Sequence, residues 1–240
     1  MKTRKILITN DDGISAAGLI RLAEQAIDFG EVWVVAPLSQ RSAASHSITL
    51  HSYVDVYPHS FPVPGVHAYS CSGTPGDCVR VGSLNVMPQR PDVVLSGINF
   101  GYNVASDIQY SATAGAAFEG AFQGYLSIAL SEEASVCHEV ADAYLPEVLK
   151  GLLDRPLGPG QIWNVNFPGC PASECRGIVE ERTVSRGMVY RDHYIQLEKL
   201  AGGGVRLMVE GEYQEDAEDG TDYRAVLDRY VSIGIVNNIS

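Results

Sequence analysis

The sequence predicts an α/β protein: a three-layer, Rossmann-like and mainly parallel sheet with a β-rich C-terminal hairpin extension. Short, continuous apolar runs alternate with segments of helical periodicity in the first part of the chain, as in strands buried on both faces of a parallel sheet. After about residue 160 this pattern gives way to alternating apolar and polar residues. With 240 residues, 45% of them hydrophobic, the chain can bury a sizeable core.

The first two apolar runs, at 5–9 and 31–36, flank a segment at 17–29 whose leucines, isoleucines and alanines recur at helical spacing. This arrangement predicts a β-α-β unit. The same alternation continues along the chain, with strands expected at 92–96 and 126–130 and helices at about 75–86, 111–124 and 136–153.

The C-terminal part predicts antiparallel hairpins, because residues 178–200 and 205–213 alternate on either side of the turn-forming glycines at 202–204. We therefore expect an α/β core over residues 1–175 and a β-hairpin extension over residues 176–240, both within one structural unit. The remaining expectations are a segment at 161–167 that can still belong to the main sheet, a strand or hairpin arm at 48–57, a solvated acidic loop at 210–222 and a final apolar segment at 230–236.

The charge balance and the length of the apolar runs exclude several classes of protein. A formal net charge of -12 excludes diffuse electrostatic binding of a polynucleotide or an anionic membrane, whereas a small phosphorylated substrate stays compatible if a local cation offsets the repulsion. No apolar run approaches the ~20 residues of a membrane helix, and the run at 6–8 is too short for an export signal. The 5 cysteines show no Cys-x-x-Cys spacing and are interpreted as reduced thiols, so we expect a cytoplasmic protein.

The first candidate site is Asn10–Gly13, where Asp11 and Asp12 follow directly after a predicted strand. Doubly wound sheets bind their ligands at the carboxyl ends of the strands. Adjacent carboxylates repel each other, and a hard divalent cation such as Mg²⁺ or Mn²⁺, which prefers oxygen ligands, would keep both ionised. The alternative is that this motif caps the helix that follows it.

Two loops after other predicted strands carry further polar groups. The loop at 36–47 is rich in hydroxyl groups and contains Arg41 and His46, so it can bind an anion, donate an oxygen to a metal, or be an ordinary polar loop. The loop at 96–103 combines glycines, which permit close backbone approach, with asparagine carbonyl oxygens. Because the fold brings the ends of parallel strands to one rim, these loops support one another as parts of one site.

Residues 110–120 indicate the start of a helix with two hydroxyl groups near its N-terminal end. Unpaired N–H groups and the helix dipole make such a place suitable for a phosphate. Capping by Ser111 or Thr113 is the alternative, and one helical turn can serve both purposes.

At these residues the sequence resembles the SurE family of stationary-phase survival proteins, which are divalent-metal-dependent nucleotidases that hydrolyse nucleoside monophosphates. The resemblance rests on an ordered series of motifs over most of the first 130 residues, at 8–13, 35–37, 41–42, 46–49, 72–75 with 77–79, 96–103, and 110–113 through 119–120. Weaker similarities follow at 164–166, 221–222 and 230–233. The ordered series is specific, although no single motif would be.

The resemblance implies one divalent cation per subunit, Mg²⁺ or Mn²⁺, and it makes Asp11 and Asp12 the catalytic residues. The implied metal ligands are all oxygen donors: Asp11, Asp12, Ser42 and Asn99. The candidate contacts to the phosphate and the substrate are Asn10, Ser45, Asn103, Ser111 and Thr113. The family's C-terminal hairpin makes dimer contacts, which implies a homodimer or homotetramer that assembles through the extension.

The implied reaction is hydrolysis of nucleoside 5′- or 3′-monophosphates to nucleoside and phosphate. We favour direct attack by a metal-activated water, with an acyl phosphate on Asp11 as the alternative. A phosphatase for other small phosphate esters or short polyphosphate would use the same site, and a non-catalytic nucleotide-sensing module would keep the fold and the metal. His46 would either protonate the leaving oxygen or only orient the hydroxyl-rich loop.

The sequence departs from the family pattern at four places. Ser45 and Ala112 stand where glycine is usual, so a Cβ would narrow the site if either backbone takes a positive φ. Arg229 also replaces a usual glycine, and the chain from Val236 onward lacks the usual Pro-Leu ending. These changes concern substrate choice and C-terminal geometry more than the hydrolytic chemistry.

Overall fold

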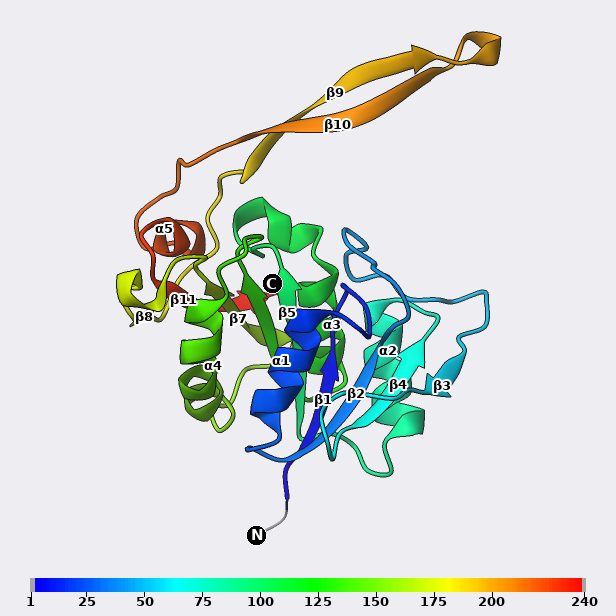
Figure 1. Ribbon diagram of the computed structural model, residues 1–240, viewed down its shortest axis with the longest axis vertical. Coiled ribbons are helices and arrows are strands. Elements are labelled where there is room, and N and C mark those ends of the chain that lie inside the picture. The colour runs from blue at the N-terminus through cyan, green and yellow to red at the C-terminus, as the bar shows by residue number, and fades with distance from the viewer. Residues whose placement is uncertain (1–2, 239–240) are drawn as a thin grey trace.

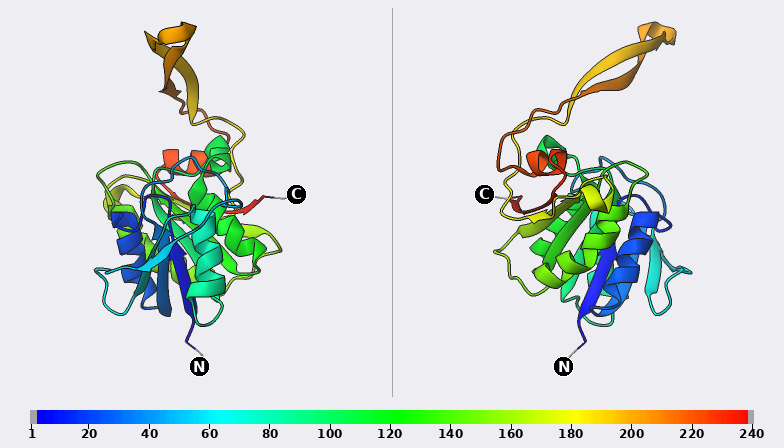
Figure 2. Two further views of the ribbon diagram at one scale, coloured as in Figure 1. Left: turned by 90° about the vertical axis from the view of Figure 1, so that its right-hand side faces the viewer. Right: turned by 60° about the vertical axis from the view of Figure 1, so that its left-hand side comes forward.

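The computed structural model describes residues 3–238 and contains a nine-stranded sheet with helices on both faces (Figures 1 and 2). In spatial order its strands are β3 (Val56–Pro58), β4 (His67–Cys71), β2 (Glu31–Pro37), β1 (Lys5–Thr9), β5 (Val93–Phe100), β6 (Leu126–Glu132), β7 (Gln161–Phe167), β11 (Val231–Asn237) and β8 (Ile178–Val179). The six strands from β4 to β7 are parallel, whereas β3 and β11 run antiparallel to β4 and β7. The predicted Rossmann-like, mainly parallel class is confirmed.

Helices α1 (Ala17–Ala26) and α4 (Glu139–Leu152) cover one face of the sheet, and α2 (Pro75–Val81) and α3 (Ala112–Phe122) cover the other (Figure 2). Strand β1 shows why the sheet needs both layers. Ile6 and Ile8 pack in the cluster that includes α1 and α4, whereas Leu7, which points to the opposite face, packs in the cluster that includes α2. Strand β1, which carries apolar side chains on both of its faces, is therefore covered on both faces.

The remaining helical segments are short: the π-helical η1 (Gly82–Val86), the 3-10 turns η2 (Ala105–Gln109), η3 (Ala172–Glu174) and η4 (Ala201–Gly203), and α5 (Asp222–Leu227). The single helix expected at 75–86 is thus α2 continued by η1. Of the strand expected at 48–57, only the start of β3 forms. None of the helices described between residues 3 and 238 is long enough and apolar enough to cross a membrane.

Strands β9 (Tyr190–Lys199) and β10 (Val205–Tyr213) form a separate antiparallel hairpin that projects from the body of the molecule (Figures 1 and 2). Gly202 and Gly203 turn the chain between them, with φ values of 76° and 83°. The hairpin extension is confirmed, although it is one hairpin: β8 and β11 join the main sheet instead. The acidic segment begins inside β10 and becomes a loop only after residue 213.

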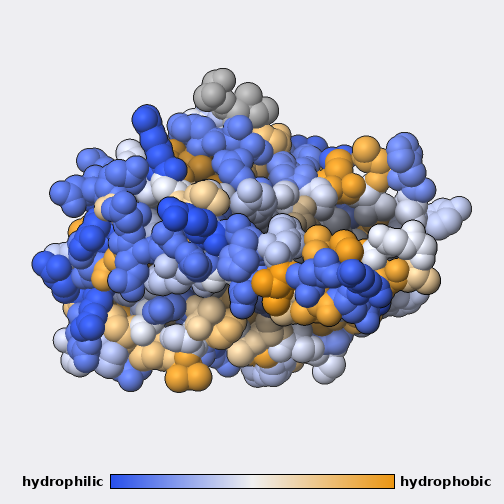
Figure 3. All heavy atoms as spheres, turned by 90° about the horizontal axis from the view of Figure 1, so that it is seen from above, coloured by the Kyte–Doolittle hydropathy of each residue, from blue (hydrophilic) through white to orange (hydrophobic). Residues whose placement is uncertain are grey.

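Every residue of β10 is exposed, and the exposed side chains of the hairpin include large apolar ones. They are Tyr190, Tyr194, Leu197, Leu200, Val205, Leu207, Met208, Val209 and Tyr213. Seen from the end from which the hairpin projects, the surface shows hydrophobic patches beside hydrophilic ones (Figure 3). Such a concentration of exposed apolar side chains is typical of an interaction surface.

Candidate functional site

The carboxyl ends of β1 and β5 meet where the strand order of the sheet reverses. From β1 the order runs through β2 and β4 on one side, and from β5 through β6 and β7 on the other. Thr9, the last residue of β1, pairs with Ser96 of β5, and Asn99 follows near the end of β5. Doubly wound proteins bind their ligands in the crevice at this point, so Asp11, Asp12 and Asn99 border it.

Three elements hold the two aspartates. Asp11 is buried, and Thr113 Oγ1 of α3 donates a hydrogen bond to Asp11 Oδ1 at 2.5 Å. The Arg41 N–H donates to the carbonyl oxygen of Asp11 at 2.6 Å, which ties the loop after β2 to the end of β1. Asp12 is half-buried, and its Oδ2 accepts a hydrogen bond from the Phe100 N–H at 3.1 Å. The predicted carboxylate pair is therefore fixed in place rather than free in a loop.

Neither aspartate caps the helix that follows. The N-cap of α1 is Ala16, which makes no side-chain capping bond. Asn10 closes the turn instead, because its Oδ1 accepts from the Gly13 N–H at 3.2 Å and its Nδ2 donates to the Gly13 carbonyl at 3.0 Å. The capping interpretation of Asp11 and Asp12 is wrong. The Asn10 side chain is engaged in this turn, and its contact with substrate stays a prediction.

The environment of the carboxylates suits a hard cation. Burial raises the pKa of Asp11 to about 6, and burial also raises the pKa of Asp12. A cation at this place would reverse that effect, because it favours the charged form of each carboxyl group. Within residues 3–238, no group of three or more His, Cys, Asp and Glu side chains could hold a metal ion. A cation beside these two aspartates would therefore also need amide or hydroxyl oxygens.

Asn99 and Ser42 are the candidates for those additional oxygens. Asn99 Nδ2 donates to the Gly101 carbonyl at 2.8 Å, which engages the amide nitrogen and leaves the amide oxygen for a cation. Ser42 directly follows Arg41, whose backbone is bonded to Asp11, and Ser42 Oγ accepts from Gln40 Nε2 at 3.0 Å. Two carboxylates, one amide oxygen and one hydroxyl form a donor set that Mg²⁺ or Mn²⁺ can use.

Helix α3 begins next to the carboxylates. Ser111 is its N-cap and accepts a hydrogen bond from the Ala114 N–H at 2.9 Å, which confirms the predicted capping role. Every residue from Ala112 to Gly120 is buried, so the position of the helix is fixed by packing. Its N-terminal N–H groups and its dipole favour an anion at this end.

Ser45 and Ala112, the two replaced glycines near the site, differ in their backbones. Ser45 has φ 52°, in the left-handed region that favours glycine, while its N–H donates to the Tyr110 carbonyl and its Oγ to the Gln109 carbonyl, at 3.0 and 2.9 Å. Ala112 lies in the helical backbone of α3. A Cβ is therefore strained at Ser45 and unstrained at Ala112.

Asn103 is buried among polar groups at the ends of β6 and β7. Its Nδ2 donates to Ser131 Oγ at 2.7 Å, and its N–H donates to Asn166 Oδ1 at 2.8 Å. Its carbonyl oxygen accepts from the side-chain amides of Asn164 and Asn166. Asn103 thus ties the loop after β5 to the neighbouring strands, and its contact with phosphate stays a prediction.

Comparison with known proteins decides the family. The family model of Survival protein SurE matches residues 6–189 of this chain. The chain belongs to the SurE family. Proteins named 5′-nucleotidase SurE from Clostridium botulinum (strain Loch Maree / Type A3) and Mesorhizobium japonicum are both 37% identical to it, over 232 and 239 residues, which cover 95% of this chain and 90% and 91% of those proteins. The crystal structure of the SurE protein from Aquifex aeolicus superposes with a TM-score of 0.80 at 31% identity and covers 97% of this chain and 93% of that one.

From the sequence of this SurE chain we assigned no role to Glu119, whose carboxylate holds the His46 side chain in place. Glu119 is buried in α3, and its Oε2 lies 2.9 Å from His46 Nε2. Glu119 is six residues beyond Thr113, which is ~9 Å along a helix axis and away from the carboxylates. Gly115 lies between Thr113 and Glu119 in the sequence of α3, and a Cβ at this position would lie 2.5 Å from the Ser45 carbonyl oxygen. The geometry supports the interpretation that His46 orients the hydroxyl-rich loop against α3.

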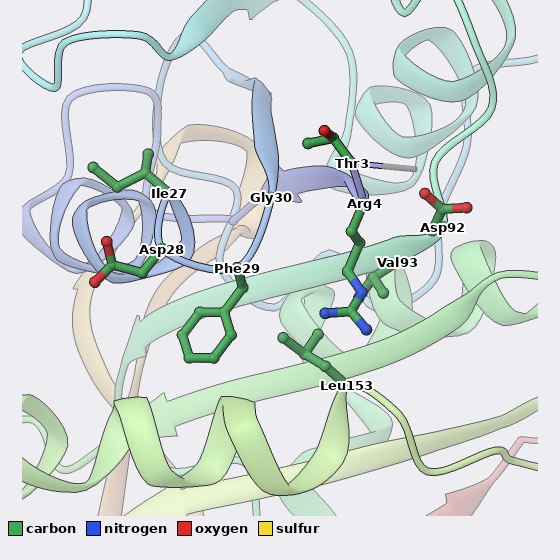
Figure 4. Close-up of a pocket in the computed structure, with 9 residues that line it drawn as sticks. All are labelled: Thr3, Arg4, Ile27, Asp28, Phe29, Gly30, Asp92, Val93 and Leu153. Carbon is green, nitrogen blue, oxygen red and sulfur yellow. The ribbon is translucent and has the colours of Figure 1, made fainter. Parts of the chain in front are cut away.

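The two largest cavities of this SurE chain lie at the other end of the sheet. One, of about 700 Å³, is bordered by Arg4, Asp28 and Asp92 at the amino ends of β1 and β5 (Figure 4). The other, of about 950 Å³, lies between the end of α3 and residues 153–161. Arg4 Nη2 pairs with Asp154 Oδ1 at 2.5 Å, so this cation is already neutralised. Neither cavity reaches the carboxyl-end crevice.

Proposed function

We propose that this chain is a divalent-metal-dependent phosphomonoesterase that hydrolyses nucleoside 5′- or 3′-monophosphates to nucleoside and phosphate. The observation that carries the proposal is the buried pair Asp11 and Asp12 at the strand-order reversal, bonded to the start of α3 through Thr113. The names of the relatives, 5′-nucleotidase SurE, support the same substrate class.

The chain's own residues would hold one Mg²⁺ or Mn²⁺ per subunit through Asp11, Asp12, Ser42 and Asn99. When bound, the cation would polarise the phosphoryl oxygens and lower the pKa of a water molecule. The chain's -12 net charge repels a phosphate dianion at long range, so the N–H groups at the start of α3 serve to bind it locally. Ser111 and Thr113 stand at that end of the helix.

In this proposal the two aspartates act because their carboxylates are held in fixed positions. Thr113 fixes the Asp11 carboxylate, and the Phe100 N–H fixes the Asp12 carboxylate. The reaction in this proposal is direct attack by water, with an acyl phosphate on Asp11 as the alternative. Ser45, Asn10 and Asn103 would shape the surrounding loops.

The test is phosphate release from nucleoside monophosphates, glycerol phosphate and tripolyphosphate, each with Mn²⁺, with Mg²⁺ and with EDTA. We expect metal-dependent release from the nucleotides, and a loss of more than about 100-fold in Asp11→Asn and Asp12→Asn, since these are proposed ligands rather than their outer partners. Asp28→Asn is the matched control, because Asp28 is an exposed carboxylate at the opposite end of the sheet. Full activity in both site variants would refute the metal assignment.

Two other results would each favour an alternative. Faster release from glycerol phosphate or tripolyphosphate than from any nucleotide would indicate a phosphatase for other small phosphates. No release from folded protein, combined with thermal stabilisation by nucleotides, would indicate a nucleotide-sensing module. In that case Ser45→Gly is the first reversion, because Ser45 alone of the two replaced glycines is strained.

We also propose that the chain is a homodimer or homotetramer in which the 176–240 extension contacts a second copy. The exposed apolar side chains of β9 and β10 support this proposal, since none of them belongs to a core cluster of the residues that the structure describes. Light scattering should report an oligomer for the wild type and a smaller species for Leu207→Glu, which alters only the exposed hairpin. An unchanged mass in that variant would refute the assignment of the surface.

A further inference from the structure

A cavity of about 330 Å³ opens beside Asp12, on the face of the sheet that α1 covers. Its size lies at the lower end of the range for small-molecule sites. Ala16, Ala17 and Gly18 form its wall on the α1 side, so small side chains keep it open. Phe100, next to Asn99 in β5, also lines the cavity, and this residue is 55% exposed. The cavity thus borders the proposed phosphate site and carries an exposed aromatic ring.

The charged groups of the cavity are already paired. The Arg21 guanidinium donates to both carboxylate oxygens of Glu132, at 2.8 and 3.1 Å, and to Asp142 Oδ1 at 2.7 Å. His138 Nδ1 lies 3.0 Å from Glu132 Oε1. Arg21 therefore has little capacity left for a phosphate, and Asp12 and Glu132 together outweigh its charge. An anion is disfavoured in this cavity, whereas a neutral aromatic group is not.

We infer that this cavity receives the base of the nucleotide, stacked on Phe100, while the phosphate lies at Asp11 and the start of α3. This inference rests on the proposed function and names the part of the substrate that the cavity would bind. Asp12 connects the two places, since it lines the cavity and accepts the Phe100 N–H at 3.1 Å. In a nucleotide a single sugar separates the base from the phosphate. This short separation matches the position of the Phe100 ring next to Asp12, one of the proposed metal ligands.

Stacking on one side chain is tolerant of base identity, because every base presents an aromatic face. The His138 ring is tilted to the Phe100 ring by 56° at a centroid distance of 6.5 Å, so it flanks the stacking surface without covering it. Phe100 is accordingly assigned as a specificity-determining residue for nucleotides over phosphate esters that lack a base.

The experiment compares kcat/KM for AMP with kcat/KM for glycerol phosphate in the same enzyme. In Phe100→Ala this ratio should fall about 5- to 150-fold, as expected when one base-stacking contact is removed, and most of the loss should be in the KM for AMP. Phe100→Tyr keeps a ring and should retain the ratio. Tyr57→Ala, which removes another exposed aromatic residue, 64% exposed and in β3, is the matched control. An unchanged ratio in Phe100→Ala would overturn the inference.

A second measurement separates this inference from the proposed function. Calorimetry with adenosine, which has no phosphate to hydrolyse, should give a Kd that rises about 5- to 150-fold in Phe100→Ala. If the wild type binds adenosine in this way but releases no phosphate from AMP, the proposed function fails and the base site stands. If adenosine binds wild type and Phe100→Ala equally, or binds neither, the base site fails whatever the activity.

Discussion

Asp222 makes the folded protein less stable as the pH rises, whereas an aspartate usually has the opposite effect. It is the first residue of α5 and only 3% exposed. Its carboxylate accepts three backbone N–H groups, from Ser185 at 2.9 Å, Tyr223 at 2.7 Å and Ala105 at 3.3 Å. These bonds lower its pKa, but burial has the larger effect and raises the pKa to about 6 from 3.8.

The magnitude follows from the difference between the folded and unfolded states. A shift of about two pKa units corresponds to about 3 kcal/mol at 1.36 kcal/mol per unit. Between pH 4 and 6 the folded state holds the proton more tightly than the unfolded state, so the free energy of unfolding falls as the pH rises through this window. Below pH 4 the carboxyl group is protonated in both states and the effect is absent.

Replacing Asp222 by Asn removes the ionisation and keeps an oxygen acceptor. Relative to wild type, the unfolding free energy of Asp222→Asn should therefore rise by up to about 3 kcal/mol between pH 4 and pH 7. Other titrating groups, including Asp11, are present in both proteins and cancel in the difference. Urea denaturation at half-unit pH steps measures it, with the exposed Asp219→Asn as a control whose difference stays flat. A difference that is constant or falls with pH would show that the three N–H groups outweigh burial.

Three other changes test the site and the strained backbone. Thr113→Val removes the hydroxyl that holds Asp11, and phosphate-release assays should show a loss of about 10- to 100-fold with an unchanged melting temperature within a few degrees; full activity would contradict the positioning role. Ser45→Gly should be more stable than Ser45→Ala by about 1 kcal/mol in urea unfolding, because both lose the hydroxyl but only glycine relieves φ 52°, and the reverse order would refute the strain. Arg229→Gly should raise the free energy of unfolding by about 0.5 to 1 kcal/mol, because Arg229 follows α5 with φ 64°, a conformation that favours glycine. The ion pair that this change removes, between Arg229 and Glu174, is exposed and contributes little. Destabilisation of the variant would contradict this prediction.

The strands that could be predicted are those whose burial leaves a continuous apolar run. β1, β2, β5 and β6 are of this kind, and their order along the chain places Asp11 and Asn99 at one edge. β4 could not be predicted, because His67–Cys71 mixes polar and aromatic residues and is stabilised by pairing with β2. α5 is only a turn and a half long, too short for a helical period to stand out from the acidic residues before it.

For the site, the sequence indicates which types of residue come together, but it does not indicate which of their atoms already make hydrogen bonds within the protein. The motif around Asp11 predicts a carboxylate pair, whereas its bond to Thr113 joins residues 102 positions apart and depends on the packing of α3. Glu119 looks like an ordinary helical glutamate until α3 is seen to lie against the loop of His46. The sequence predicts that Phe100 lies in the loop at 96–103, whereas the structure places it at the end of β5, where it is exposed and lines a cavity.

Strand β11 lies between β7 and β8, and it is synthesised after the hairpin of β9 and β10. A ribosome adds about 5 to 20 residues per second, so the hairpin emerges while the β7 edge of the sheet is still open. At that stage its tyrosines and leucines are exposed and the β7 edge is unpaired, and an unpaired strand edge can pair with another chain. Because β11 is translated after the hairpin, its pairing with β7 completes the main sheet. The same step ends the interval in which a newly made chain is most prone to associate with other chains.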